Sequence, residues 1–153
     1  MLDFEFMSPT QFVFGRGVEE KVGDKLAERG AKKVLLHFGG QSAVRSGLID
    51  RVCASLDAAG VECVKLGGVR PNPEIGLVRE GVALCKENGV DWVLAVGGGS
   101  CVDYAKAVAV SKDLPAGEDP WDVYFDRFEE PAADREVVPV GSVLTMVGTG
   151  SEM

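Results

Sequence analysis

The sequence contains a single histidine, His37, and four cysteines that form no CxxC pair among its 153 residues. Zinc sites in proteins draw mainly on closely spaced cysteines and histidines, so the ligand spacing of a conventional zinc site is missing. Four thiols without close spacing fit a reduced cytosolic protein better than a disulfide-bonded secreted one. His37 ends an apolar stretch, which predicts a packed core residue and not a catalytic one.

Long apolar runs and an excess of basic residues are also missing. No apolar run reaches 18 residues, and the first ten residues, MLDFEFMSPT, carry two acids in place of a basic signal-peptide start. Acidic residues number 24 against 16 basic ones, for a net charge of -8. This balance excludes long-range attraction to nucleic acid or to an anionic membrane. We therefore expect a cytoplasmic protein that holds any phosphate group locally, through amides and helix dipoles.

Apolar strands alternate with amphipathic helices along most of the chain, which we treat as one domain over residues 1–153. Strands separated by helices of 10–15 residues predict an α/β fold with a Rossmann-like, doubly wound, mostly parallel sheet. Residues 4–6 and 12–14 alternate around Ser8-Pro9 and predict a short N-terminal β-ribbon. The expected strands end at Phe38, Leu66, Val96 and Leu144, and the expected helices are Val18–Arg29, Leu48–Ala59, Glu74–Asn88 and Ser100–Ser111.

The alternation fails between Lys112 and Arg135. This stretch is rich in proline and acidic residues, and it carries four aromatic rings, those of Trp121, Tyr124, Phe125 and Phe128. Proline and acidic clusters interrupt regular structure, whereas aromatic rings favour burial. The sequence therefore predicts a long surface excursion that is partly pinned by its rings.

Small and hydroxyl-bearing residues follow all four expected strands. They are Gly39–Ser42, Gly67-Gly68 with the loop to Asn72, Gly97–Ser100, and Thr145 with Gly148–Ser151. In parallel α/β sheets, ligands bind beyond the carboxyl ends of the strands. A row of amides and hydroxyls there suits an elongated, phosphate-bearing ligand. Gly97–Ser100 is the best single site, because the helix that follows offers free N–H groups and the positive end of its dipole.

The stretch from Ser100 to Asp103 also has a purely structural interpretation. Its spacing is that of a capping box, with Ser100 as N-cap and Asp103 reaching back to the Ser100 amide. That role alone would explain both residues, and it is compatible with ligand contact. A position at the start of a helix can lower the pKa of a cysteine and make its thiol reactive. For Cys101, however, a small packed residue is the favoured interpretation.

Four blocks in order, PTQFVFGRG, GGVRPNPE, DWVLAVGGGSCVDYAKAVA and LTMVGTGSE, resemble the N-terminal domain of the iron-containing (group III) alcohol dehydrogenases. HFGGQSAVRSGLIDRV adds a resemblance to the butanol dehydrogenase branch. The resemblance implies an NAD(P)-dependent oxidoreductase that interconverts primary alcohols and aldehydes by hydride transfer. It also implies that Gly97 to Asp103 hold the cofactor pyrophosphate, and that Asn72, Thr145, Thr149 and Ser151 line the rest of the groove. With the glycine-rich exits, the cofactor-binding candidates are Gly39, Gly40, Ser42, Asn72, Gly97, Gly98, Gly99, Ser100, Asp103, Thr145, Thr149 and Ser151.

The sequence departs from the family in one respect. In the family, a divalent metal, iron or zinc, is held by an aspartate and several histidines of a helical C-terminal domain. This sequence ends at Met153 and holds one histidine. We therefore expect the cofactor half of a longer enzyme, inactive alone, with no catalytic or metal-binding residues of its own.

Two alternatives to this reading stay open. In the first, the chain is the cofactor domain of a sister enzyme, of the glycerol dehydrogenase or dehydroquinate synthase type. In the second, it is a non-catalytic nucleotide-binding module. The expected partner is a small alcohol or aldehyde, with no nucleic acid and no membrane. The sequence leaves a homodimer open.

Cofactor preference can be approached through the exit of the first predicted parallel strand. NAD-preferring domains place an acid near such a strand end to bind the adenosine ribose, and that acid repels a 2′-phosphate. Residues 38–45 contain no carboxylate; Ser42 is a hydrogen-bond donor, Arg45 supplies positive charge, and Gly39 and Gly40 leave room. Our hypothesis is that NADP(H) is accepted at least as well as NAD(H).

Overall fold

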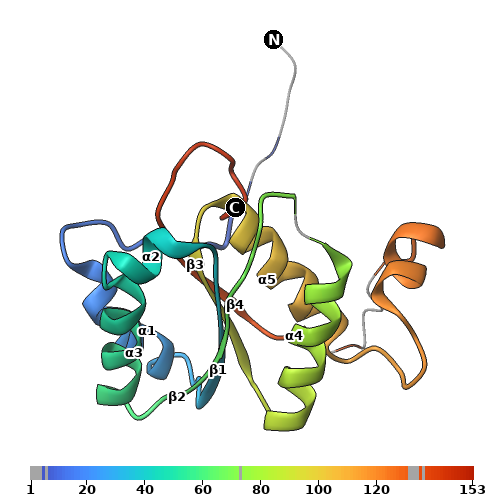
Figure 1. Cartoon of the computed structure of the whole chain (residues 1–153), viewed down its shortest axis with the longest axis horizontal. Coiled ribbons are helices and arrows are strands. Elements are labelled where there is room, and N and C mark those ends of the chain that lie inside the picture. The colour runs from blue at the N-terminus through green and yellow to red at the C-terminus, as the bar shows by residue number, and fades with distance from the viewer. Residues whose placement is uncertain (1–4, 6, 73, 131–134, 136) are drawn as a thin grey trace.

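Four parallel strands form a sheet in the order β2-β1-β3-β4, with helices on both faces (Figure 1). The computed structural model describes residues 5, 7–72, 74–130, 135 and 137–153. The strands are β1 (Lys33–Phe38), β2 (Glu62–Leu66), β3 (Trp92–Gly97) and β4 (Val140–Leu144). Their ends lie within three residues of the predicted ones, because glycine or proline directly borders each strand on at least one side.

Helices cover the two faces in a pattern that follows the alternation of side chains along the strands. Leu36, Val52 and Leu94 belong to one core cluster, and Leu35, Val93 and Val108 belong to the other. The first cluster packs under η1 (Val18–Lys21), α1 (Val22–Ala27) and α3 (Leu48–Ala58), and the second under α4 (Ile75–Asn88) and α5 (Gly99–Ser111). None of the helices in the described part of the chain is both long and apolar enough to span a bilayer. The predicted doubly wound α/β fold is confirmed.

The strand order places a topological switch point between β1 and β3. β1 pairs in parallel with β2 on one side and β3 on the other, with Phe38 opposite Val96. From β1 the chain crosses to β2 through α3, whereas from β3 it crosses to β4 through α5 on the opposite face. In open α/β sheets such a point opens a crevice at the carboxyl ends of the strands, where ligands bind.

Two local predictions differ from the structure. Residues 12–14 form no strand, and residues 4 and 6 of the predicted ribbon lie outside the described residues. Phe12 and Phe14 are exposed, and a two-stranded ribbon without a core to cover is marginally stable. The first predicted helix is broken into η1 and α1, because Lys21 leaves the helical region, with φ −105° and ψ 3°.

The excursion after α5 is pinned by one of its four rings, that of Tyr124, whereas Trp121, Phe125 and Phe128 are exposed. It contains one turn of π-helix, η2 (Asp122–Asp126), and buries Val123. The hydroxyl of Tyr124 donates a 2.8 Å hydrogen bond to the carbonyl oxygen of Val110 on α5. Arg79 of α4 pairs with both carboxylate oxygens of Asp119, at 2.7 and 3.0 Å.

His37 is packed in the core, as the apolar stretch predicted. Its side chain is fully buried, with its ring centroid 4.7 Å from that of Tyr104 in an edge-to-face arrangement. Neither imidazole nitrogen has a hydrogen-bond partner among the described residues. Burial lowers the pKa of His37 to about 4, so the ring is neutral at physiological pH.

Acid is expected to weaken the fold through this one side chain. An unfolded histidine titrates near 6.5, so between pH 6.5 and about 4 the unfolded state binds the extra proton and the folded state does not. Stability contributed by neutral His37 is therefore complete above pH 6.5 and falls by about 3 kcal/mol as pH drops to 4. Urea unfolding of wild type and His37→Leu at pH 7 and pH 4.5 measures the difference. A proton NMR titration of the sole imidazole giving a pKa of 6 or higher would contradict the prediction.

Candidate functional site

Three glycine-rich strand exits meet at the switch point, and we call this region the glycine edge (residues 38–40, 97–100 and 145–151). The amide of Thr145 donates a 2.9 Å bond to the carbonyl oxygen of Gly97, which joins the exits of β3 and β4. The thiol of Cys101 lies between the exits of β1 and β3, because its Sγ would be 3.4 Å from a methyl group added at Gly39 and 2.4 Å from one added at Gly97. Burial raises the pKa of Cys101, so the favoured interpretation of this cysteine, a packed residue, holds.

The outer two glycines of the triplet are required by packing within the chain. A methyl group added at Gly97 would lie 2.4 Å from Sγ of Cys101. One added at Gly99 would lie 2.5 Å from Oγ1 of Thr149 and 2.9 Å from its Cβ. Real Cβ atoms do not approach other heavy atoms so closely, so any side chain at either position would push β3, α5 or the 145–151 loop apart.

The middle glycine has no such requirement. Gly98 has φ −87° and ψ −169°, an extended conformation that any residue adopts. A methyl group there would meet only Cβ of Met146, at 3.7 Å, an ordinary van der Waals distance. Gly40, at the exit of β1, has φ −69° and ψ −163°, and nothing lies within 4 Å of its added methyl group. Neither the packing nor the backbone explains these two glycines.

The predicted capping box is wrong. Gly98, not Ser100, is the N-cap of α5, and no side chain caps the helix. Its carbonyl oxygen accepts the amides of Cys101 and Val102, at 2.9 and 3.4 Å. The amides of Gly99 and Ser100 lie in the first turn of α5 and have no carbonyl partner within the helix. They therefore remain available to a ligand. Because glycine supplies no capping side chain, the start of α5 is left bare.

The 145–151 loop lies against this bare start, as the sequence predicted. Thr149 contacts Gly99 and accepts a 3.3 Å hydrogen bond from the Ser151 amide through its Oγ1. The loop is anchored beyond the site by Lys106, whose Nζ donates to the backbone oxygen of Met153 at 3.1 Å. Thr145, Thr149 and Ser151 are therefore brought to the glycine edge. Met146, beside Gly98, is a residue of the site that sequence reasoning missed, because an exposed methionine in a loop carries no recognisable motif.

Three other predicted residues lie farther from this point. Ser42 is exposed on α2 (Gln41–Arg45), a short helix that the sequence analysis did not predict. Asn72 is exposed in the loop after β2, with a left-handed φ of 56°. Asp103 is exposed one turn into α5 and faces the excursion, where it lines a hollow with Trp121. No contact described in the structure joins these three to Gly98.

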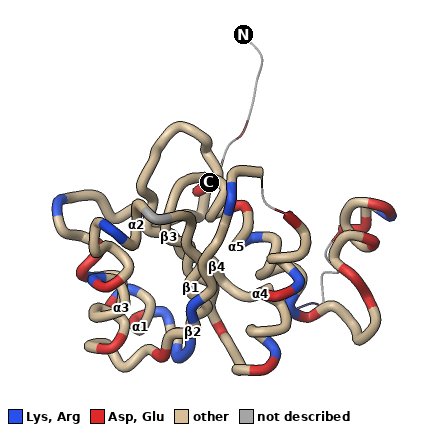
Figure 2. The backbone as a smooth tube through the Cα atoms, in the orientation of Figure 1, with Lys and Arg blue, Asp and Glu red and all other residues tan. Residues whose placement is uncertain are grey.

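The glycine edge is free of charged residues. Figure 2 shows most acidic residues on the helices and the excursion, and residues 38–44, 97–102 and 145–151 include no charged residue of either sign. None of these residues presents a carboxylate to a diphosphate, while Asp103 and Glu152 follow two of the segments directly in sequence. A diphosphate would be held by amide N–H groups and the dipole of a 13-residue helix. The arrangement can bind an anion but has no acid, base or nucleophile at hand. Within the described residues, no group of three His, Cys, Asp or Glu side chains is placed to hold a metal ion.

Known proteins match this chain over most of its length. The family described as iron-containing alcohol dehydrogenase matches residues 9–153. The chain is 42% identical over its full length to a probable NADH-dependent butanol dehydrogenase 1 of Bacillus subtilis, and 33% identical over 99% of its length to an NADPH-dependent aldehyde reductase of Escherichia coli. In each case it spans 38% of the relative.

A solved structure gives the same result. The crystal structure of an NADH-dependent butanol dehydrogenase A from Thermotoga maritima superposes with a TM-score of 0.88 at 40% identity. The match covers 97% of this chain and 36% of that one. The agreement covers sequence, fold and the N-terminal position of the matching part, so this chain belongs to the iron-containing alcohol dehydrogenase family.

Proposed function

We propose that the glycine edge binds the pyrophosphate of NAD(P)(H), and that Gly98 is the point of closest approach. One observation carries this proposal: Gly98 needs to be glycine neither for its backbone conformation nor for packing, and it stands before two unbonded amides of α5. A phosphate group that touches the backbone is the remaining physical reason to exclude a side chain. Thr149 and Ser151 line the same groove from the β4 side. The nicotinamide ring, when bound, supplies the hydride chemistry.

We propose further that the chain serves an alcohol dehydrogenase acting on primary alcohols and aldehydes. Relatives such as the butanol dehydrogenases and an aldehyde reductase are named for this substrate class. The contribution of this chain is to bind and orient the cofactor. Its only histidine is buried in the core, so we assign the metal-binding residues of the family to the part of the relatives that this chain does not span.

Two measurements test the proposal. Calorimetric titration of the 153-residue chain with NADH and NADPH should show saturable binding, and the chain with added iron or zinc should show no alcohol oxidation. A chimera that carries this chain in place of the matching segment of the Bacillus subtilis relative should oxidise butan-1-ol and lose that activity with Gly98→Val. Turnover by the 153-residue chain above the level of its Ser100→Arg variant would overturn the division of labour.

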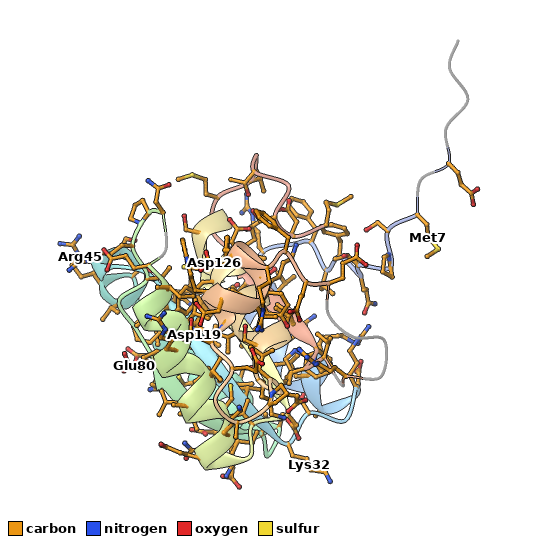
Figure 3. All side chains as sticks on the ribbon, turned by 90° about the vertical axis from the view of Figure 1, so that its right-hand side faces the viewer. Met7, Lys32, Arg45, Glu80, Asp119 and Asp126 are labelled. Carbon is orange, nitrogen blue, oxygen red and sulfur yellow. The ribbon has the colours of Figure 1, made fainter. Side chains whose placement is uncertain are left out.

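We also propose that NADP(H) binds at least as well as NAD(H). Residues 38–44 carry no carboxylate to repel a 2′-phosphate, and the space at Gly40 is open. Arg45 is exposed and points outward from α2 in Figure 3, so it has the freedom to turn toward a phosphate. The relatives differ in the cofactor that their names give. Four butanol dehydrogenases are named NADH-dependent, and the aldehyde reductase is named NADPH-dependent.

The dissociation constants of the two dinucleotides decide this preference. We expect a ratio near one or in favour of NADP(H) in the unmodified chain. Gly40→Asp should weaken NADP(H) at least tenfold, about 1.4 kcal/mol, and leave NAD(H) little changed. Arg45→Ala should weaken NADP(H) alone. Binding of NAD(H) that is at least tenfold tighter in the unmodified chain would overturn the proposal.

A further inference from the structure

Two of the four cysteines lie on elements that are neighbours both in sequence and in space. Cys53 belongs to α3 and Cys63 to β2, and only residues 59–61 connect these elements. α3 packs directly on β2, an outer strand of the described sheet (Figure 1). Both thiols are free and half-buried, whereas Cys85 and Cys101 are buried in the other core cluster. Cys53 and Cys63 are therefore the thiols that a small reagent can reach.

The strand register places Cys63 beneath α3. Cys63 lies opposite Val34 in the parallel β1–β2 pair, and residues that lie opposite each other on paired strands point to the same face of a sheet. Val34 is fully buried in the core cluster under α3, and both Cys53 and Cys63 pack against that cluster. The two thiols are therefore on the same face of the sheet.

The turn between α3 and β2 sets the two cysteines at a similar height. The amide of Val61 donates a 2.9 Å hydrogen bond to the carbonyl oxygen of Leu56, which closes this turn. From that bond, Cys53 lies about 4.5 Å back along the helix and Cys63 about 6.6 Å along the strand, at the usual rise per residue of each. Because the helix and the strand leave the turn side by side, these similar distances bring the thiols together.

The electrostatics of the pair agree with this placement. Burial raises the pKa of Cys63 to about 12, and the neighbouring Cys53 adds to the rise. Cys53 also raises the pKa of Lys65, an exposed residue on the same strand. Cys53 therefore has an ammonium group beside it, and a nearby positive charge favours the thiolate, which is the form that attacks a disulfide.

We propose that Cys53 and Cys63 form a reversible disulfide between α3 and β2, closed by exchange with a small-molecule disulfide such as oxidised glutathione. A disulfide suits the pair better than a metal ion does, because zinc sites need three or four protein ligands. No group of three His, Cys, Asp or Glu side chains in the described part of the chain is placed to hold a metal ion.

The exchange proceeds in two steps. The Cys53 thiolate attacks one sulfur of oxidised glutathione, forms a mixed disulfide and releases one glutathione as a thiolate. The mixed disulfide carries no charge on Cys53, so the contribution of Cys53 to the raised pKa of Cys63 is removed. Cys63 then loses its proton to solvent and attacks the Cys53 sulfur, which forms the Cys53–Cys63 bond and releases the second glutathione thiolate. The two cysteine sulfurs give up two electrons in total, and these reduce the glutathione disulfide.

Tryptic peptide mapping tests the proposal. Trypsin cleaves after Arg51 and Lys65, so peptide 52–65 contains Cys53 and Cys63, while Cys85 and Cys101 fall in other peptides. The folded 153-residue chain is incubated with oxidised glutathione, quenched with acid, and then unfolded and alkylated. Peptide 52–65 should be unalkylated and lighter by two hydrogen atoms, the other two cysteines should be alkylated, and dithiothreitol should reverse the change. Because the bond closes a loop in the unfolded chain, the oxidised chain should also melt at a higher temperature than the reduced chain.

A matched pair of serine variants tests the order of attack. Cys63→Ser should keep one glutathione on Cys53, because the second attack is removed, whereas Cys53→Ser should leave Cys63 unmodified under the same conditions. The proposal is overturned if wild-type peptide 52–65 is alkylated at both cysteines, or if the wild type stops at the mixed disulfide, since Cys63 would then be out of reach. It is also overturned if the oxidised chain melts at a lower temperature, which would show that the bond forces α3 away from β2. Modification of Cys63 in Cys53→Ser would overturn the assignment of Cys53 as the attacking thiol.

Discussion

Gly98→Val is expected to weaken NADH and NADPH binding at least 1000-fold, about 4 kcal/mol, while the melting temperature changes by only a few degrees. The isopropyl group would stand over the first turn of α5, where a phosphate oxygen must reach the amides of Gly99 and Ser100. The chain itself has room for it, because the backbone at Gly98 is extended and Cβ of Met146 is 3.7 Å away. Calorimetric titration and thermal melts on the same sample separate the two effects.

A matched control comes from Gly76, the second residue of α4. Nothing lies within 4 Å of a methyl group added there, so Gly76→Val makes the same change at an open position in the first turn of α4, outside the residues of the glycine edge. Binding by this variant should equal that of wild type. If Gly98→Val fails to fold and shows no separable binding defect, the glycine triplet serves only the strand-to-helix turn.

The fold could be predicted because its determinants are local. Each strand is short and bordered by glycine or proline on at least one side. Gly30, Gly60 and Gly89 follow helices with φ between 64° and 86°, a conformation that glycine adopts without strain. The N-terminal ribbon could not be predicted, since alternation in residues 12–14 does not reveal whether a partner strand or a core is present. α2 was missed because Gly39-Gly40 is typical of a turn and its helix is only five residues long.

The site could be predicted as a place but not as a set of contacts. Four glycine-rich exits indicated the carboxyl edge of a parallel sheet, and the structure gathers three of them around Gly98. Gly97 and Gly99 must be glycine because Cys101 and Thr149 pack against them, whereas Gly98 has no such neighbour. Thr149 is 50 residues away from Gly99 in sequence, so this contact could not be predicted. A capping box was predicted at Ser100 because the pattern is local, whereas the true N-cap is set by where β3 ends.

Among the described glycines, Gly23 is the one where an added methyl group would come closest to another atom, at the contact of α1 with α3. A methyl group added at Gly23 would lie 2.0 Å from the carbonyl oxygen of Ser55 and 2.9 Å from the amide nitrogen of Leu56. Both are backbone atoms, so no side-chain rotation relieves the overlap. The crossing is also bonded, because Oγ of Ser55 accepts the Gly23 amide at 2.9 Å and donates to the carbonyl oxygen of Glu20 at 2.7 Å.

Gly23→Ala is therefore expected to lower the free energy of unfolding by about 4 kcal/mol or more, and the melting temperature by roughly 10 °C or more. The added methyl group forces α1 away from α3, which uncovers Leu26 and breaks both bonds of Ser55. Urea unfolding at pH 7 measures the loss. Gly76→Ala, again in an open helical position, should instead stabilise the chain by roughly 0.5–1 kcal/mol, since alanine is the better helix former. A Gly23→Ala chain that melts within two or three degrees of wild type would show that α1 and α3 do not pack this closely in solution.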